Sequence, residues 1–300
     1  MRKRMKLVAV VLCLSMFFAV AQACGSKSDK KKEDVTTENK TDVGTSQGQE
    51  GNAVVTIEEQ VLFEQDGIVV TAKEYVTDRI WGDGIKLLIE NNSDKSVTVG
   101  CNALIVNNYM ISDLFVSGVA AGKKANEIMY LSNTELEAAG IESVGQIEAY
   151  FHVYDSDTYE TLFDTECVTI QTSEYENMDT VADDTGVELY NEGDIRIVGK
   201  TVDENSFWGT AILLYCENNS GKNIGISVDE MSINGFMMDP LFTTTVYDGK
   251  MAFEDITIFS EDLVANGIEA IEDVEIRFHV YDASTYETIA DSEAVTFSAQ

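Results

Sequence analysis

The chain has 300 residues, and its 53 Asp and Glu residues against 20 Lys and Arg residues give a formal net charge of -33. This balance argues against nucleic acid as a partner, because phosphate binding needs clusters of basic side chains. It also argues against domains that lie flat on an anionic membrane. The simplest interpretation of the charge is a solvated, self-repelling surface, and affinity for cations or basic polymers is the alternative.

The first 23 residues have the three-part layout of a secretory signal peptide. The basic residues at the start are Arg2, Lys3, Arg4 and Lys6. An apolar run from Leu7 to Val20 follows, and the small residues Ala21 and Ala23 end the segment. Because the run is shorter than the ~20 residues that a helix needs to cross a bilayer, we expect a signal that is removed rather than a transmembrane helix.

Cys24 comes directly after these small residues, and the segment resembles the lipobox of bacterial lipoproteins. The resemblance implies a lipid on the Cys24 thiol, removal of residues 1–23 and a place on the extracytoplasmic face of the cell membrane. Ala21 stands where that family mostly carries Leu, and Ala21-Gln22-Ala23 also fits ordinary signal peptidase, so plain secretion is the alternative. Residues 24–52 are almost entirely polar, which predicts a disordered tether.

A duplication organises the rest of the chain. Trp81-Gly82 recurs 127 positions later as Trp208-Gly209, and other segments repeat at the same offset. These pairs are Glu90–Ser93 with Glu217–Ser220, Phe151–Asp155 with Phe278–Asp282, and Thr158–Thr161 with Thr285–Thr288. The repeat predicts two domains, residues 53–172 (the first repeat) and 187–300 (the second repeat), joined by a polar connector at 173–186.

Within each repeat, apolar and polar residues alternate with a period of two. In the second repeat Val274, Ile276, Phe278 and Val280 alternate with Glu275, Arg277, His279 and Tyr281. Such a strand has one buried and one wet face, as in an antiparallel sheet. About seven short strands per repeat and one short helix predict an all-β fold, with two tandem immunoglobulin-like antiparallel β-sandwiches, each with one short crossover helix.

The predicted helix lies between Ser132 and Gly140. Ser132 and Glu135 have the spacing of a capping box, Leu136 and Ala139 can face inward, and Gly140 suits a left-handed end. Ser260, Leu263 and Gly267 repeat this outline in the second repeat.

Three segments carry a family resemblance: Glu90–Lys95, Ala138–Ile141 and Phe151–Asp155. They resemble the immunoglobulin-like domains of unknown function that recur in lipoproteins of Gram-positive anaerobes. The resemblance covers nearly all of residues 55–300. It implies the sandwich architecture, and it implies neither a catalytic motif nor a known ligand.

Five cysteines are present, of which Cys13 lies in the signal and Cys24 takes the lipid. The remaining three, Cys101, Cys167 and Cys216, have apolar or small counterparts in the other repeat. We therefore expect small core hydrophobes rather than a disulfide framework, with a Cys101–Cys167 bridge as the alternative.

The sequence contains no HExxH, GxSxG, phosphate-loop or dinucleotide-binding pattern, and no cofactor is expected. We therefore expect a non-catalytic role in binding, adhesion or scaffolding. The expected partners are the membrane, through the lipid anchor, and a cell-envelope polymer or another envelope protein. A solute-capturing lipoprotein of a transport system and an unrecognised hydrolase are the alternatives.

The candidate recognition surface is an outward row of Tyr150, His152 and Tyr154, with the counterparts His279 and Tyr281. Exposed rings beside carboxylates can stack on sugars or hold cationic groups. The alternatives are that the rings pair across the strands, or that they pack against the tether or the sister repeat.

Two further predictions concern single positions. Asp155, Asp157 and Glu160 could bind calcium, whereas Asp155 alone is explained by a turn. Trp81 and Trp208 stand at equivalent positions, which predicts that they pack in the core.

Overall fold

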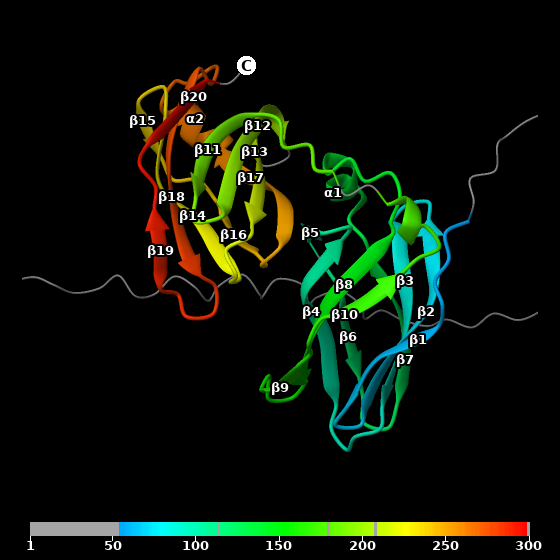
Figure 1. The fold of residues 1–300 in the computed structure, drawn as a ribbon. Coiled ribbons are helices and arrows are strands. Elements are labelled where there is room, and N and C mark those ends of the chain that lie inside the picture. Colours follow the sequence, from blue (N-terminus) through cyan, green and yellow to red (C-terminus); the bar gives the residue numbers. More distant parts are fainter. Residues whose placement is uncertain (1–53, 113, 179–180, 207–208, 299–300) are drawn as a thin grey trace, which may run out of the picture. The chain divides into compact units, whose positions relative to one another are not determined.

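Strands make up most of the computed structural model, which describes residues 54–112, 114–178, 181–206 and 209–298 (Figure 1). The first repeat contains β1 (Gln60–Gln65), β2 (Ile68–Asp78), β3 (Gly82–Asn91), β4 (Val97–Val106), β5 (Tyr109–Ile111), β6 (Val116–Val119), β7 (Lys124–Tyr130), α1 (Asn133–Ala138), β8 (Gln146–Asp155), β9 (Thr161–Asp164) and β10 (Val168–Gln171). A 3-10 turn, Tyr175–Asn177, lies in the connector.

The second repeat contains the same elements in the same order. They are β11 (Val187–Glu192), β12 (Ile195–Ser206), β13 (Gly209–Asn218), β14 (Ile224–Ile233), β15 (Phe236–Met238), β16 (Thr243–Val246), β17 (Lys250–Phe259), α2 (Ser260–Ala265), β18 (Asp273–Asp282), β19 (Thr288–Asp291) and β20 (Val295–Ser298). Each repeat thus has ten described strands rather than about seven. The additional ones include short segments of three or four residues, such as β5 and β9, which are too brief to show a periodic pattern.

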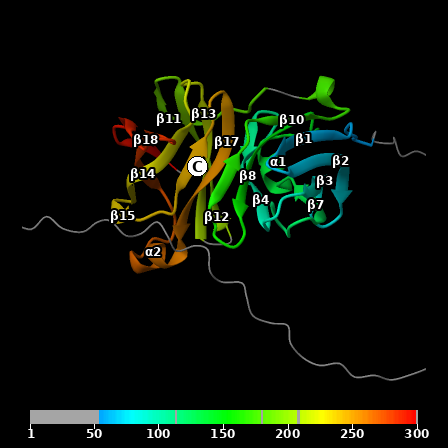
Figure 2. The same ribbon diagram turned by 90° about the horizontal axis from the view of Figure 1, so that it is seen from below.

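Each repeat is a sandwich of two sheets. In the first repeat one sheet has the order β1-β2-β3-β7, and β10-β8-β4 forms the other, with β5, β6 and β9 attached. In the second repeat β11-β12-β13-β17 faces β15-β14-β18-β19, with β16 and β20 attached. Figure 2 shows β17 beside its antiparallel neighbour β13. The predicted all-β sandwich architecture is confirmed.

The period-two pattern decides which side chains fill the cores. Along β8, the buried Ile147, Ala149, Phe151 and Val153 alternate with half-buried side chains. The equivalent positions of β18 are buried too, and they alternate with exposed or half-buried side chains. Each sandwich therefore has its own cluster of buried aliphatic and aromatic side chains, and the burial of this apolar surface is the main source of its stability.

The short helices differ from the prediction at their first turns. Ser132 makes no capping hydrogen bond, and the Glu135 carboxylate instead accepts one from the Ser112 backbone N–H at 2.6 Å. The predicted capping box is therefore wrong, because the acid is used to tie the helix to the segment after β5. Leu136 is buried and Gly140 has φ +68°, as predicted. Neither described α-helix, six residues each, is long or apolar enough to cross a bilayer.

A buried asparagine ends β3, and another ends β13. The Asn91 amide donates to the carbonyl oxygens of Lys95 and Val119, each at 2.8 Å, and its oxygen accepts from the backbone N–H and hydroxyl of Ser93. In the second repeat Asn218 makes the same four contacts with Lys222, Val246 and Ser220. Asn91-Asn92-Ser93 is thus a turn, and Asn91 also joins it to the end of β6.

A short parallel pairing connects the two sandwiches. β5 pairs with β17 through Tyr109 with Met251 and Met110 with Ala252, so that one sheet runs through both repeats. Tyr109 is 3% exposed and stacks on Phe253 with ring centroids 5.8 Å apart. Residues 52–300 accordingly form one compact unit.

Candidate functional site

A stack of three rings lies at one end of β8 in the first sandwich. The His152 and Tyr154 rings are 5.5 Å apart, and Tyr159 from the following turn stacks on Tyr154 at 6.2 Å with an angle of 26° between the planes. His152 and Tyr154 are half-buried, whereas Tyr159 is 78% exposed. The stack therefore presents an aromatic face to solvent at the end of the strand.

The second sandwich repeats this stack. His279 and Tyr281 lie 5.5 Å apart, and Tyr286 stacks on Tyr281 at 5.9 Å with an angle of 19°. Tyr286 is 77% exposed. We call His152, Tyr154 and Tyr159 the first ring stack, and His279, Tyr281 and Tyr286 the second ring stack.

Both outer tyrosines have strained backbones. Tyr159 has φ +61° and Tyr286 has φ +60°, a region in which Gly or Asn is favoured and a bulky side chain costs on the order of 1 kcal/mol. Neither ring gains stability from burial, since each is more than three-quarters exposed. The conformation of the turn therefore does not favour tyrosine at these positions, which indicates that the aromatic rings have a role of their own.

The inner ring of the second stack lies flat on the sheet. Tyr281 pairs with Gly225 of β14, and a Cβ added at Gly225 would meet the tyrosine ring at 2.1 Å. The missing side chain thus makes room for the ring. Tyr286 then stacks on the Tyr281 ring, whose position is set by the strand below it.

Carboxylates hold the histidines in the two stacks. Nδ1 of His152 lies 2.6 Å from the Asp164 carboxylate, and Nδ1 of His279 lies 2.6 Å from Asp291. The hydrogen bond with His152 keeps the pKa of Asp164 below its usual value. Each pair joins opposite residues of neighbouring strands, which confirms that these histidines form surface cross-strand pairs.

Tyr150 does not belong to the first ring stack. Its ring packs edge-on against Tyr247 of the second repeat, with centroids 4.9 Å apart, and burial raises the pKa of its hydroxyl. Of the five residues predicted for the recognition surface, the structure therefore groups His152 with Tyr154 and His279 with Tyr281, and it places Tyr150 against the sister sandwich. Tyr159 and Tyr286 were not predicted, although both stand in the repeated Thr-Tyr-Glu-Thr segment.

Both carboxylate oxygens of Asp155 have partners, in the backbone of the following turn and in a lysine side chain. One carboxylate oxygen accepts the backbone N–H groups of Asp157 and Thr158, and the other pairs with Lys95 at 3.1 Å. These donors lower the pKa of Asp155, the Asp157 N–H having the largest effect. The turn interpretation of Asp155 is confirmed, and among the described residues no group of three or more His, Cys, Asp or Glu side chains could hold a metal ion.

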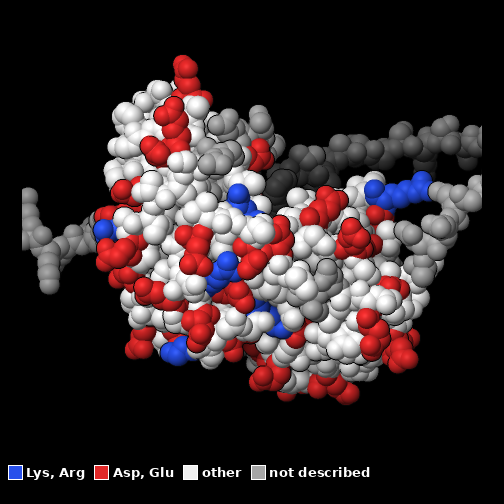
Figure 3. All heavy atoms as spheres, turned by 45° about the horizontal axis from the view of Figure 1, so that its top comes forward, with Lys and Arg blue, Asp and Glu red and all other residues white. Residues whose placement is uncertain are grey.

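Acidic side chains are spread over the described surface of the chain. Figure 3 shows many Asp and Glu residues over the visible face and only scattered Lys and Arg residues. Several of the lysines pair with acids, as Lys86 does with Glu74 at 2.6 Å. Asp157 and Glu160 flank Tyr159 and are exposed. Hydrogen-bond acceptors thus flank the outer ring of the first stack, and a lysine pairs with an acid of the same turn in each repeat, Lys95 with Asp155 and Lys222 with Asp282.

The cysteines differ from one another in their surroundings. Cys216 is completely buried, as predicted, and Cys101 is half-buried beside the first core, with its sulfur 3.7 Å from that of Met129. The prediction is wrong for Cys167, which is exposed because it lies in the loop between β9 and β10. None of these three described cysteines lies in a disulfide, so the alternative Cys101–Cys167 bridge is not formed.

Trp81 lies outside the core, contrary to the prediction. The Asp78 carboxylate accepts the backbone N–H groups of Ile80 and Trp81 and closes a turn between β2 and β3. The indole at the tip of this turn is 66% exposed and contacts Tyr130. Trp208 lies outside the described residues, as do the predicted signal peptide, Cys24 and the tether.

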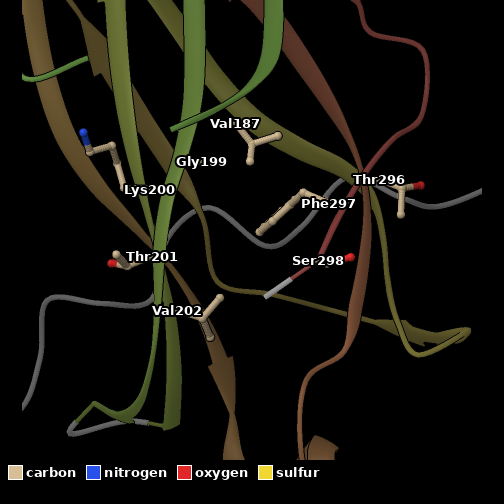
Figure 4. Close-up of a pocket in the computed structure, with 8 residues that line it drawn as sticks. All are labelled: Val187, Gly199, Lys200, Thr201, Val202, Thr296, Phe297 and Ser298. Carbon is tan, nitrogen blue, oxygen red and sulfur yellow. The ribbon is translucent and has the colours of Figure 1, made fainter. Parts of the chain in front are cut away.

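A pocket of about 420 Å³ opens between β11–β12 and β20 in the second sandwich (Figure 4). Val187, Val202 and Phe297 project into it, and Thr201, Thr296 and Ser298 lie at its border. The Lys200 amine is turned toward the Asp183 carbonyl oxygen, at 2.9 Å, and the Thr185 hydroxyl. The lining is thus aliphatic, aromatic and hydroxylic, without an acid–base pair.

Comparisons with known proteins add little. No family model matches the sequence, and no curated protein matches it. Among solved structures, the chain is similar to one from the complex described as Salmonella enterica SafA pilin with the SafB chaperone, at 10% identity over 72% of this chain and 88% of that chain, with a TM-score of 0.22. A similarity at that TM-score supports no functional inference.

Proposed function

We propose that this chain is a lipid-anchored, extracytoplasmic lipoprotein that binds a cell-envelope polysaccharide through its two ring stacks. The observation that most supports this proposal is the pair of strained, exposed tyrosines, Tyr159 and Tyr286, each of which stacks on an inner tyrosine. The C–H faces of sugar rings are apolar and pack on flat aromatic faces, and the neighbouring carboxylates accept hydrogen bonds from sugar hydroxyls. Two stacks on one chain provide two binding points, which raises the overall affinity for a polymer.

Solute capture is the weaker alternative. It would use the pocket beside β20, whose volume is within the usual range for small ligands. Its lining, however, offers a few hydroxyl groups and no described charged group aimed at a ligand. A hydrolase has still less support. The described acid–histidine pairs, His152 with Asp164 and His279 with Asp291, are cross-strand pairs at the surface, and no sequence motif identifies a catalytic nucleophile beside them.

Binding is tested by replacing both outer tyrosines with asparagine. Tyr159→Asn and Tyr286→Asn remove the rings and place a residue that tolerates positive φ, so the fold should keep or slightly raise its melting temperature. We expect the double variant to bind purified cell-envelope polysaccharide about tenfold more weakly or worse, since each lost stack is worth roughly 1 kcal/mol. Isothermal titration and co-sedimentation with the polymer measure this.

Trp81→Ser is the matched control, because it removes an exposed ring from a different turn. Its affinity should equal that of the unmodified chain. If the tyrosine variant binds polysaccharide with unchanged affinity, or if Trp81→Ser causes the same loss, the ring stacks are not the binding site.

Anchoring is tested separately at Cys24. Cells grown with labelled palmitate should incorporate the label into the protein, and Cys24→Ser should abolish it, because the thiol is the predicted point of attachment. Membrane fractionation should find the unmodified protein with the membrane. Unlabelled protein in the medium would instead establish plain secretion, without bearing on the ring stacks.

A further inference from the structure

Two strands form the join between the two sandwiches. We call β5 of the first repeat the donor, because it is the strand added to a sheet, and the outer edge of β17 in the second repeat the acceptor, because it is the sheet edge that receives it. The Met251 backbone N–H donates to the Asn108 carbonyl oxygen at 3.0 Å, and the Lys250 amine contacts the Glu148 carboxylate at 2.5 Å. Both side chains of this ion pair are about 15% exposed, so the join excludes most water from it.

The donor part has a counterpart that is not covered. Adding the repeat offset of 127 to β5 leads to β15, in which Phe236 and Met237 stand for Tyr109 and Met110. Phe236 is 47% exposed and Met237 is 67% exposed, against 3% for Tyr109. β15 is the last strand of its sheet, and the described residues place no strand against its outer edge.

The acceptor part has a counterpart as well. Subtracting 127 from β17 leads to β7, which is the last strand of the sheet β1-β2-β3-β7 and has an open outer edge within the described residues. Lys123 stands for Lys250, and Glu275 of β18 stands for Glu148 of β8. Both Lys123 and Glu275 are exposed. One copy of the chain therefore carries an unused donor and an unused acceptor, with both members of the ion pair retained.

We propose that β15 of one copy pairs in parallel with β7 of the next copy, with an ion pair between Glu275 and Lys123, in the manner of the join within the chain. The donor and acceptor are different surfaces, so the contact is heterologous, and successive copies add head to tail. An exposed strand edge is a ready template for such pairing.

The contact between copies is weaker than the join within the chain. Asn126 stands for Phe253, so the aromatic stack of the join has no counterpart, and Ala120 stands for Tyr247. The join also benefits from the covalent connector, which raises the effective concentration of its two parts. Head-to-tail association is therefore expected at high protein concentration, in the range that anchoring to a membrane would produce.

Charge reversal tests the pairing. Sedimentation velocity of the full chain in mild detergent, from low micromolar to near-millimolar concentration, should show a sedimentation coefficient that keeps rising beyond a dimer. Lys123→Glu and Glu275→Lys should each weaken this association about tenfold or more, because each places like charges opposite one another. An equimolar mixture of the two variants should restore it, since each donor then meets a complementary acceptor.

Phe236→Ser is the second probe, and Val264→Ser on α2, another exposed apolar position, is its matched control. Phe236→Ser should weaken association and Val264→Ser should not, while both keep the melting temperature of the unmodified chain. A chain that stays monomeric throughout overturns the proposal. So does a dimer that Phe236→Ser disrupts and Lys123→Glu leaves intact, because it would show that β15 pairs with itself.

Discussion

Replacing either buried asparagine with alanine is expected to destabilise its sandwich by about 3 kcal/mol. Asn218→Ala removes four hydrogen bonds, and it leaves the buried Val246 carbonyl oxygen without its donor from the turn. Asn91→Ala has the same effect on the Val119 carbonyl in the first sandwich. Each variant should lower the melting temperature by roughly 10 °C, as measured by calorimetry or circular dichroism.

Asn92→Ala is the matched control, because Asn92 is adjacent to Asn91 in the same turn and is exposed. Its effect should stay within about 0.5 kcal/mol. If Asn91→Ala is as mild as Asn92→Ala, then water replaces the amide and the asparagine does not hold the turn to β6.

Replacing Glu254 with glutamine is expected to stabilise the chain above pH 7. Burial raises the pKa of Glu254 from 4.5 to about 7, against a hydrogen bond from the Thr244 hydroxyl that lowers it. Between these two pH values the folded state keeps a proton that the unfolded state has released, so stability falls as the pH rises from about 4.5 to about 7. Above that interval Glu254→Gln should raise the free energy of unfolding by roughly 2 to 3 kcal/mol.

Urea unfolding of both proteins at pH 4.5 and pH 8 measures this difference. The gain should be near zero at the lower pH and complete at the higher one. Glu127→Gln is the control, because it changes the equivalent exposed residue of the first sandwich and should leave stability unchanged at both values. Asp155 acts in the opposite direction, since its lowered pKa gives stability that is lost as the pH falls below about 4. An equal gain at both pH values for Glu254→Gln would show that the gain does not come from a raised pKa of Glu254.

Most of the sandwich could be predicted from the sequence because a strand has a strict period. The alternation through Phe151 and Phe278 identified the buried face of β8 and β18, and the repeat offset carried each assignment to the other copy. Gly140 was similarly predictable, because a helix often ends at a residue in the left-handed conformation and that residue is usually glycine.

The errors came from positions whose surroundings the apolar–polar alternation of a strand does not predict, such as turns, loops and the contact with the other sandwich. Trp81 follows an Asp78 turn that carries it past the end of the core, and Cys167 falls in a loop rather than on a strand. Tyr150 points outward from its own sandwich, as its period requires, but the second sandwich covers it. The outer tyrosines were missed because a positive φ at a non-glycine residue leaves no mark on the sequence.

The ends of the first sandwich are fastened to each other. The Ser173 backbone N–H donates to the Thr56 carbonyl oxygen at 2.8 Å, and Ile57 and Thr172 form an isolated antiparallel bridge. The chain thus enters and leaves this sandwich at neighbouring points. A mechanical load pulled along the chain, between a fixed amino-terminal end and a ligand held by the second repeat, would pass across this clamp. The clamp and the β5–β17 join would share such a load, and the clamp would shield the core of the first sandwich in part until its hydrogen bonds break.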